Sequence, residues 1–317
     1  MTPERIVFLG TADLAVPSLQ ALLQARHHVV AVVTQPDRAK GRSLKVQPSS
    51  VKTFSIQRGL PVLQPERARD EAFVEEIATL KPDLIIVVAY GQILPQRLLD
   101  LPRFGCVNVH TSLLPKHRGA APIQWAILKG DSETGVSLMK MDAGLDTGDV
   151  LAQSVAPIES NDDSQSLHDR LAKLGAELLV QTLPDYVSGR IPGRKQSAMG
   201  ESSYARKITR DDGRIEWAKA ARAIFNQIRG LKPWPGAFTF FKRDSATCLL
   251  KIWAAEPDSG GKGEPGEVIH RAPAQLVVAC GQESLRLLEV QREGGRRITI
   301  AEFLAGNPLS VGSSLGD

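Results

Sequence analysis

The 317-residue chain contains little cysteine and no long apolar run. Its three cysteines, Cys106, Cys248 and Cys280, are far apart, so they give neither a disulfide framework nor a Cys-x-x-Cys metal spacing. No apolar stretch reaches the roughly 18 residues that a membrane-spanning helix needs, and the first apolar run is too short for a signal peptide. We therefore expect a protein of a reducing compartment, the cytoplasm or an organelle matrix, with no membrane segment.

The common signatures of nucleotide, metal and nucleophile sites are also absent. The first predicted strand ends in Gly10-Thr11-Ala12-Asp13 and not in G-x-G-x-x-G, so it does not predict a dinucleotide site. The sequence has no Walker A motif, no H-E-x-x-H, no EF-hand loop and no G-x-S-x-G elbow. The six histidines are scattered, which argues against a metal. A mechanism without a metal and without a covalent nucleophile is favoured.

What is present is the composition of a globular protein. The chain has 42% hydrophobic and 23% charged residues, and its 39 basic and 35 acidic residues give a formal charge of +4. This small excess of positive charge is only weak evidence that the protein binds nucleic acid. Stronger evidence would have to come from local clusters of basic residues. At roughly 150 residues per domain, the length suggests two domains.

The first 110 residues alternate between short β-prone runs and helical spacings. This alternation indicates βαβ units and a parallel sheet, a Rossmann-like α/β domain. After residue 110 the pattern predicts a helix over 121–128 and two strands around a polar turn, and Ser164 is the predicted N-cap of a long helix. The strands predicted in the first 110 residues cover 5–9, 29–33, 60–63, 84–88 and 106–110, and the helices cover 14–23, 51–57 and 72–80.

A segment rich in Gly, Pro and Ser separates the two predicted domains. We place the first domain at 1–189, the linker at 190–208 and the second domain at 209–317. Beyond a short helix, the second domain shows short β-prone segments separated by Gly-rich turns, which predicts a small β-barrel or sandwich. Its tryptophans, Trp217, Trp234 and Trp253, are expected in the core.

Three polar residues form a candidate catalytic group. Asn108 and His110 end a predicted strand and alternate to the same side, while Asp146 lies in a glycine-flanked turn. The amide could donate to an oxyanion, the imidazole could move a proton, and the carboxylate could orient the imidazole. From spacing alone, the favoured interpretation is a turn asparagine, a satisfied strand-end histidine and a capping aspartate, and these residues by themselves identify no reaction.

A longer run around this strand resembles a known family. Residues 108–123, Asn-Val-His-Thr-Ser-Leu-Leu-Pro-Lys-His-Arg-Gly-Ala-Ala-Pro-Ile, resemble the signature of the folate-dependent formyltransferases, and 141–148, Met-Asp-Ala-Gly-Leu-Asp-Thr-Gly, resemble their second catalytic loop. The resemblance extends from Gly10-Thr11 to Lys-Pro-Trp-Pro-Gly-Ala at 232–237, nearly the whole chain. It implies a Rossmann-like formyltransferase domain followed by a smaller OB-like β-barrel that binds tRNA.

The resemblance also implies an activity and its site residues. The formyl donor would be 10-formyltetrahydrofolate, with Asn108, His110 and Asp146 catalytic and no metal. The folate would contact Ser112, Leu113, Leu114 and Pro115, whose backbone is made rigid by the proline, and further contacts would come from residues 84–92. Without the resemblance, residues 112–115 would be interpreted as a plain hydrophobic turn.

The acceptor is indicated by a basic insertion after the second strand. Residues 35–48 are long for a βα connection and carry Arg38, Lys40, Arg42 and Lys45 against one acid. Such charged runs are usually solvated loops. The resemblance implies more, because in relatives that formylate methionine on initiator tRNA this loop enters the acceptor end of the tRNA, and Arg42 is the favoured contact there. We expect a monomer acting on methionyl initiator tRNA. The alternatives are formylation of a nucleotide-linked amino sugar, hydrolysis of the formylated folate, and an inactive RNA-binding protein.

Overall fold

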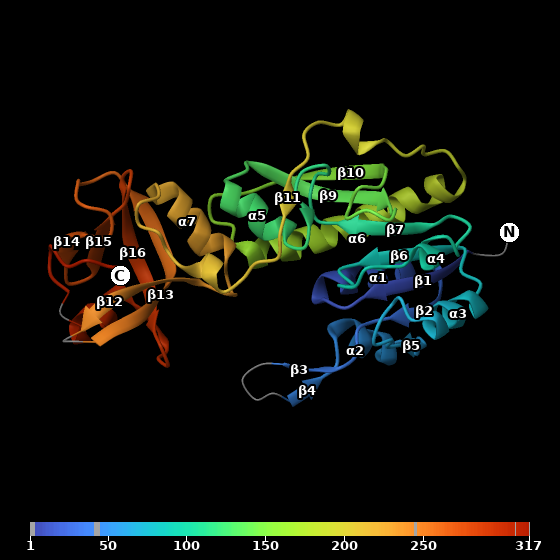
Figure 1. Cartoon of the computed structure of the whole chain (residues 1–317), viewed down its shortest axis with the longest axis horizontal. Coiled ribbons are helices and arrows are strands. Elements are labelled where there is room, and N and C mark those ends of the chain that lie inside the picture. The colour runs from blue at the N-terminus through green and yellow to red at the C-terminus, as the bar shows by residue number, and fades with distance from the viewer. Residues whose placement is uncertain (1–3, 41–44, 244–245, 308, 317) are drawn as a thin grey trace. The chain divides into compact units, whose positions relative to one another are not determined.

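The computed structural model describes residues 4–40, 45–243, 246–307 and 309–316 and divides the chain into two compact units (Figure 1). Unit 1 takes most of the chain up to Ala205. Unit 2 comprises Arg206 onward together with two short excursions, Ile123–Ser132 and Ile158–Leu167. The segment expected as a linker, residues 190–208, therefore lies in unit 1 up to Ala205.

A seven-stranded sheet forms the centre of unit 1. In spatial order its strands are β10 (Val150–Pro157), β9 (Glu133–Lys140), β7 (Cys106–His110), β6 (Leu84–Val88), β1 (Arg5–Gly10), β2 (His28–Val33) and β5 (Val62–Leu63). The five strands from β7 to β5 in this order are parallel, whereas β9 is antiparallel to both β7 and β10. The predicted α/β fold of the first domain is confirmed.

Apolar strands explain why this sheet is covered on both faces. All five residues of β6 are buried, as its unbroken apolar run predicts. Val7, Ile85 and Val87 share one core cluster with Phe73 and Ile77 of a covering helix. The helices of this unit are α1 (Val16–Gln24), which follows a 3-10 turn (Asp13–Ala15), α2 (Ser50–Gln57), α3 (Glu71–Thr79), α4 (Gln96–Leu99) and α6 (Ser164–Val187, from His168 in this unit), with a second 3-10 turn at Gln196–Ala198.

The long helix α6 approaches the sheet closely at a glycine. A Cβ added at Gly175 would lie 2.9 Å from Cγ1 of Val109 and 3.4 Å from Cγ1 of Val136. The glycine therefore allows α6 to pack tightly against β7 and β9. The N-cap prediction for this helix is wrong by one residue. Asp163 Oδ1 accepts from the Gln165 and Ser166 amides at 3.0 Å, whereas the Ser164 hydroxyl donates to the Gly230 carbonyl.

Two small sheets stand apart from the main sheet of unit 1. The predicted loop after β2 contains an antiparallel pair, β3 (Arg38–Lys40) and β4 (Lys45–Gln47), which projects away from the main sheet in Figure 1. A parallel pair joins β8 (Arg118–Gly119) to β11 (Tyr204–Ala205). The second pair brings the end of unit 1 onto the loop that follows β7.

Unit 2 is built on an antiparallel sheet, as predicted. The path runs β12-β13-β16-β15-β14, and β17 pairs with β16. The C-terminal segment bridges both edges of this path, through Leu315 to Phe241 of β12 and through Ser314 to Glu267 beside β14. This closure agrees with an OB-like barrel. The elements are α5 (Pro122–Lys129, from Ile123 in this unit), a 3-10 turn (Asp211–Gly213), α7 (Ala221–Gly230), β12 (Ala237–Arg243), β13 (Ala246–Asp258), β14 (Val268–Ala272), β15 (Gln275–Ala279), β16 (Ser284–Arg292), β17 (Arg297–Thr299) and α8 (Ile300–Gly306).

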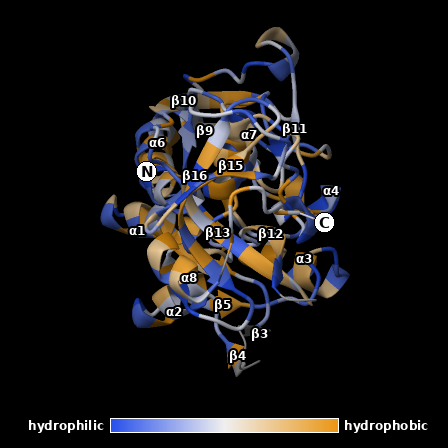
Figure 2. Ribbon diagram, turned by 90° about the vertical axis from the view of Figure 1, so that its left-hand side faces the viewer, coloured by the Kyte–Doolittle hydropathy of each residue, from blue (hydrophilic) through white to orange (hydrophobic). Residues whose placement is uncertain are grey.

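The core of unit 2 lies between its sheet and two helices. Ile224 and Ile228 of α7 pack with the strands, and Phe241 meets Phe303 of α8 edge to face at 5.4 Å. Figure 2 shows hydrophobic stretches along the strands and hydrophilic ones in the connecting loops. Trp217 is buried and Trp253 half-buried, but Trp234 is 57% exposed in the turn between α7 and β12, so its expected place in the core is wrong. Among the described residues, no helix combines the length and apolar character needed to cross a membrane.

Candidate active site

The strand β7 carries two of the predicted catalytic residues to the carboxyl end of the parallel sheet. Asn108 pairs with Val87 of β6 and Met139 of β9, and His110 pairs with Ser137 of β9. Being two residues apart in a strand, Asn108 and His110 point to the same face. His110 is buried and Asn108 is half-buried. Carboxyl ends of parallel strands are the usual ligand sites of open α/β sheets.

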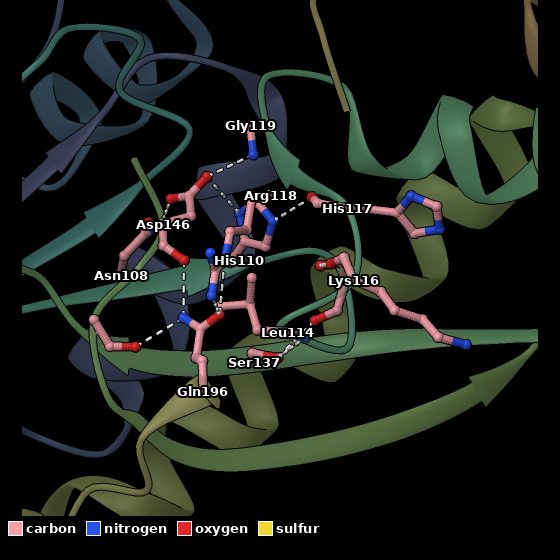
Figure 3. Close-up of polar contacts among 12 residues, drawn as sticks. Asn108, His110, Leu114, Lys116, His117, Arg118, Gly119, Ser137, Asp146 and Gln196 are labelled. Carbon is pink, nitrogen blue, oxygen red and sulfur yellow. Dashed lines mark hydrogen bonds and ion pairs between the residues drawn. The ribbon is translucent and has the colours of Figure 1, made fainter. Parts of the chain in front are cut away.

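The loop between β9 and β10 supplies the third residue. Asp142 Oδ1 accepts from the Gly144 amide at 3.0 Å and from the Thr147 hydroxyl at 2.7 Å, which closes the first half of the loop. A Cβ at Gly148 would lie 1.8 Å from the Lys140 carbonyl oxygen, so only glycine fits there. Between these fixed points Asp146 adopts a left-handed backbone with φ of 54°, and its carboxylate turns toward β7 (Figure 3).

The three predicted catalytic side chains converge. Asp146 Oδ1 lies 3.5 Å from Asn108 Nδ2, and Asp146 Oδ2 lies 3.7 Å from His110 Nδ1. The carboxylate is closer to a third group than to either of these side chains, because Oδ2 accepts a hydrogen bond from the Gly119 amide at 2.8 Å. The two long distances leave the amide of Asn108 and the imidazole of His110 weakly held on the side that faces Asp146.

The opposite side of the imidazole is fixed. His110 Nε2 lies 3.0 Å from the carbonyl oxygen of His117. Since a carbonyl only accepts, Nε2 is assigned as the protonated nitrogen, and Nδ1 carries the lone pair in the neutral ring. The nitrogen that can gain or lose a proton at the site is therefore Nδ1, beside Asp146.

The predicted folate segment is a tight buried turn. The Ser137 hydroxyl donates to the Ser112 carbonyl at 2.6 Å and accepts from the Leu114 amide at 2.9 Å, and Gln153 donates to the Leu114 carbonyl at 2.9 Å. Ser112 and Leu114 are fully buried, and the Ser112 hydroxyl donates to a carbonyl of the same turn. Because these polar groups already have hydrogen-bond partners within the protein, their role in this structure is to fix the conformation of the loop that follows β7. Pro115 is also buried and Leu113 is half-buried.

The loop after β6 lies beside the ends of β1 and β2. The Ala89 carbonyl accepts from the Thr11 amide at 3.3 Å, and the Tyr90 carbonyl accepts from the Thr11 hydroxyl and the Gln35 amide group, both at 2.9 Å. Burial raises the pKa of the Tyr90 phenol to about 12. Ala89 and Tyr90, part of the region expected to add folate contacts, thus link the segments that follow three parallel strands, at the carboxyl end of the sheet.

The predicted tRNA residues lie in and beside the β3–β4 hairpin. Arg38 is exposed, with its guanidinium 4.0 Å from the Glu66 carboxylate. The backbone of Lys40 in β3 is in register with that of Lys45 in β4, and Arg42 lies outside the described residues. No contact joins this hairpin to Asn108, His110 or Asp146 among the residues the structure describes.

The acid of this region is already neutralised. Lys52 of α2 donates to Asp37 at 2.6 Å and Gln64 donates at 2.8 Å, and these hydrogen bonds lower the pKa of the Asp37 carboxyl. The basic residues of the hairpin region therefore have no unpaired acidic side chain within residues 35–48.

Sequence reasoning missed Gln196 and Arg118. Both are polar groups that meet at the site from segments far apart, and the side chain of Gln196 is buried against the Asp146 loop (Figure 3). No spacing or motif marks Gln196, because it lies in a stretch whose composition is typical of a linker. The described residues contain no group of three His, Cys, Asp or Glu side chains placed to hold a metal.

Two family models match most of the chain. Residues 4–183 match the formyl transferase model and residues 207–308 match the formyl transferase C-terminal domain model. A methionyl-tRNA formyltransferase of Citrifermentans bemidjiense is 48% identical over 317 residues, which cover 100% of this chain and 98% of that protein.

Two solved structures share the fold. The sugar 3N-formyl transferase WlaRD, solved in the presence of dTDP and 5-N-formyl-THF, is similar with a TM-score of 0.65 and 20% identity, over 92% of this chain and 98% of that chain. HypX of Aquifex aeolicus in complex with tetrahydrofolic acid has a TM-score of 0.62 and 20% identity, over 96% of this chain and 47% of that chain.

Proposed function

The chain belongs to the formyl transferase family, and from this premise we propose that it formylates the amino group of methionine carried by initiator tRNA. The donor is 10-formyltetrahydrofolate. The observation that carries this proposal is the convergence of Asn108, His110 and Asp146 at the carboxyl end of β7. The full-length identity to a methionyl-tRNA formyltransferase supports the choice of acceptor.

The reaction moves a formyl group between two nitrogens. The methionine amine attacks the formyl carbon, a new C–N bond forms, and negative charge develops on the formyl oxygen. The bond from that carbon to the folate nitrogen then breaks, and the proton lost by the amine ends on the folate nitrogen. The site must therefore stabilise an oxyanion and carry one proton between two nitrogens.

The side chain best suited to the oxyanion is Asn108. The contact that its Nδ2 makes among the described residues is one of 3.5 Å with Asp146, which leaves it able to donate a shorter bond to a developing charge. A donor preorganised in a buried site contributes because it needs no reorganisation when the charge appears.

Proton movement is assigned to His110 and Asp146. The His117 carbonyl holds Nε2, so Nδ1 takes the proton from the attacking amine and returns it to the leaving nitrogen. The carboxylate of Asp146, 3.7 Å from Nδ1, stabilises the imidazolium while it exists. The Gly119 amide keeps that carboxylate in place.

Two basic regions are proposed to hold the tRNA. In unit 1, Arg38, Lys40, Arg42 and Lys45 of the hairpin region suit phosphate contacts near the reacting end, since the neighbouring acid is paired with Lys52. In unit 2, Trp234 is exposed in the turn between α7 and β12, and Lys251 donates to the carbonyl of the adjacent Pro235 at 2.9 Å. An exposed aromatic ring beside basic groups is typical of RNA-binding surfaces. We further propose that the protein acts as a monomer in the cytoplasm.

An acceptor panel tests this function. The protein is supplied with 10-formyltetrahydrofolate and with methionine-charged initiator tRNA, methionine-charged elongator tRNA, or a dTDP-linked amino sugar. Formylation of the initiator tRNA alone is the expected result. Transfer to the amino sugar and not to tRNA would favour the alternative activity, whose fold WlaRD shares. Release of formate without transfer to any acceptor would indicate a hydrolase.

A further inference from the structure

The segment that contains the 3-10 turn Gln196–Ala198 and ends in β11 runs along both loops of the active site. We call residues 194–205 the strap. At one end, Arg194 and Val150 exchange two main-chain hydrogen bonds of 2.9 Å, just beyond the Asp146 loop. At the other end, the Ser203 hydroxyl accepts from the His117 amide at 2.8 Å, beside the pairing of β11 with β8. The strap thus touches the loop that carries Asp146 and the loop whose carbonyl fixes His110.

One side chain of the strap joins the two loops directly. Gln196 is 3% exposed. Its Nε2 donates to the Asp146 and Gly148 carbonyls, each at 2.8 Å, and its Oε1 accepts from Arg118 Nε at 2.9 Å and Nη2 at 2.8 Å. Both donors and both acceptor positions of the amide are used, so the side chain can occupy only this orientation.

These bonds set the place of the Asp146 carboxylate. Arg118, held by the Gln196 oxygen, precedes Gly119, whose amide donates to Asp146 Oδ2. On the other side, Gln196 holds the carbonyl of Asp146 itself, a non-glycine residue with φ of 54°. Since left-handed backbone is unfavourable for such a residue, the loop depends on contacts from outside it. Gln196 supplies two of them.

We propose that Gln196 is a positioning residue for formyl transfer, acting through Asp146, an inference that rests on the function proposed above. It holds the two loops at the separation at which the carboxylate reaches His110 Nδ1 and Asn108 Nδ2. Loss of the amide allows the carboxylate to move, and displacements of about 1 Å at a reacting centre cost up to about 100-fold in rate.

The test replaces Gln196 and a matched glutamine. Gln196→Ala lowers kcat by about 10- to 100-fold with the KM for folate and for tRNA within about threefold of the wild type. The control is Gln227→Ala in unit 2, because Gln227 is also buried and its Nε2 also donates to two carbonyls, those of Asp212 and Arg214. The control keeps the wild-type kcat. An equal fall in both variants would mean that loss of any buried amide suffices, and would overturn the proposal.

A double-mutant cycle separates positioning from general stability. In the Asp146→Asn background, where the carboxylate is already absent, Gln196→Ala changes kcat by less than about threefold. A loss as large as in the wild-type background would overturn the proposal.

Should Gln196→Ala not fold, Gln196→Glu keeps the acceptor for Arg118 and lacks both donors, and the same loss of kcat is expected. Failure of the wild-type protein to formylate tRNA would instead refute the proposed function.

Discussion

Replacing Asp146 by asparagine removes the charge beside His110 with almost no change of shape. The carboxylate Oδ2 lies 3.7 Å from His110 Nδ1, and both side chains are largely buried, with exposed fractions of 13% and 7%. Two unit charges at this distance interact by about 4 kcal/mol at the effective dielectric constant of about 20 that suits protein sites. If the imidazolium forms in the transition state, the lost attraction corresponds to a fall in kcat of about 10³-fold.

The assay is a single-turnover measurement of formyl transfer with both substrates saturating. The KM for each substrate should stay within about threefold, because in the proposed mechanism Asp146 acts on charge that appears only in the transition state. The Gly119 amide can still donate to the asparagine oxygen, so the thermal midpoint should change little. A folded Asp146→Asn protein that transfers formyl within about threefold of the wild-type rate would refute the assignment of proton movement to His110 and Asp146.

Three further predictions concern the tRNA contacts and the acid stability of unit 2. Arg42→Leu should raise the KM for charged tRNA by about tenfold or more through loss of a charge-assisted phosphate bond, with folate binding unchanged; equal loss of folate affinity in equilibrium binding would contradict it. Trp234→Ala should weaken tRNA binding in filter assays by about 5- to 100-fold, as loss of one stacked base predicts, while Trp234→Phe retains most of it; unchanged binding by the alanine variant would exclude stacking. Hydrogen bonding from Arg206 lowers the pKa of Asp212 to about 2, so this carboxylate stabilises the fold above about pH 4 and its contribution is lost as the pH falls toward 2; urea unfolding of Asp212→Asn should show a smaller loss of stability between pH 5 and pH 3 than the wild type, and an identical loss would contradict the pairing.

The parts of the fold that follow from local pattern were predictable. The unbroken apolar run at 84–88 indicated a strand buried on both faces, and β6 has all five residues buried. Alternation placed Asn108 and His110 on one face of β7, where the structure has them. Such periodicities show which side of an element faces the core. They can be recognised in the sequence because they depend only on a few neighbouring residues.

What the sequence did not reveal depends on contacts between distant segments. Gln196 bonds to Asp146 across 50 positions and to Arg118 across 78, and nothing near it in the chain marks those partners. Ser164 had the residue type of an N-cap, but its hydroxyl bonds to the carbonyl of Gly230, 66 positions away, and the preceding aspartate caps the helix. Trp234 was expected in the core because tryptophan is mostly buried, yet its turn leaves the ring exposed.

In the proposed mechanism, Asn108, His110 and Asp146 act together in formyl transfer to methionyl initiator tRNA. The most direct test compares single-turnover transfer by the wild type, by Asn108→Ala, His110→Ala and Asp146→Asn, and by the triple variant. The effects of groups that act as a unit are strongly non-additive. We therefore expect the transfer rate of each single variant to fall at least about 100-fold, and the triple variant to be no more than about tenfold slower than the slowest single variant. Wild-type rates in any folded single variant, or losses that multiply in the triple variant, would contradict it.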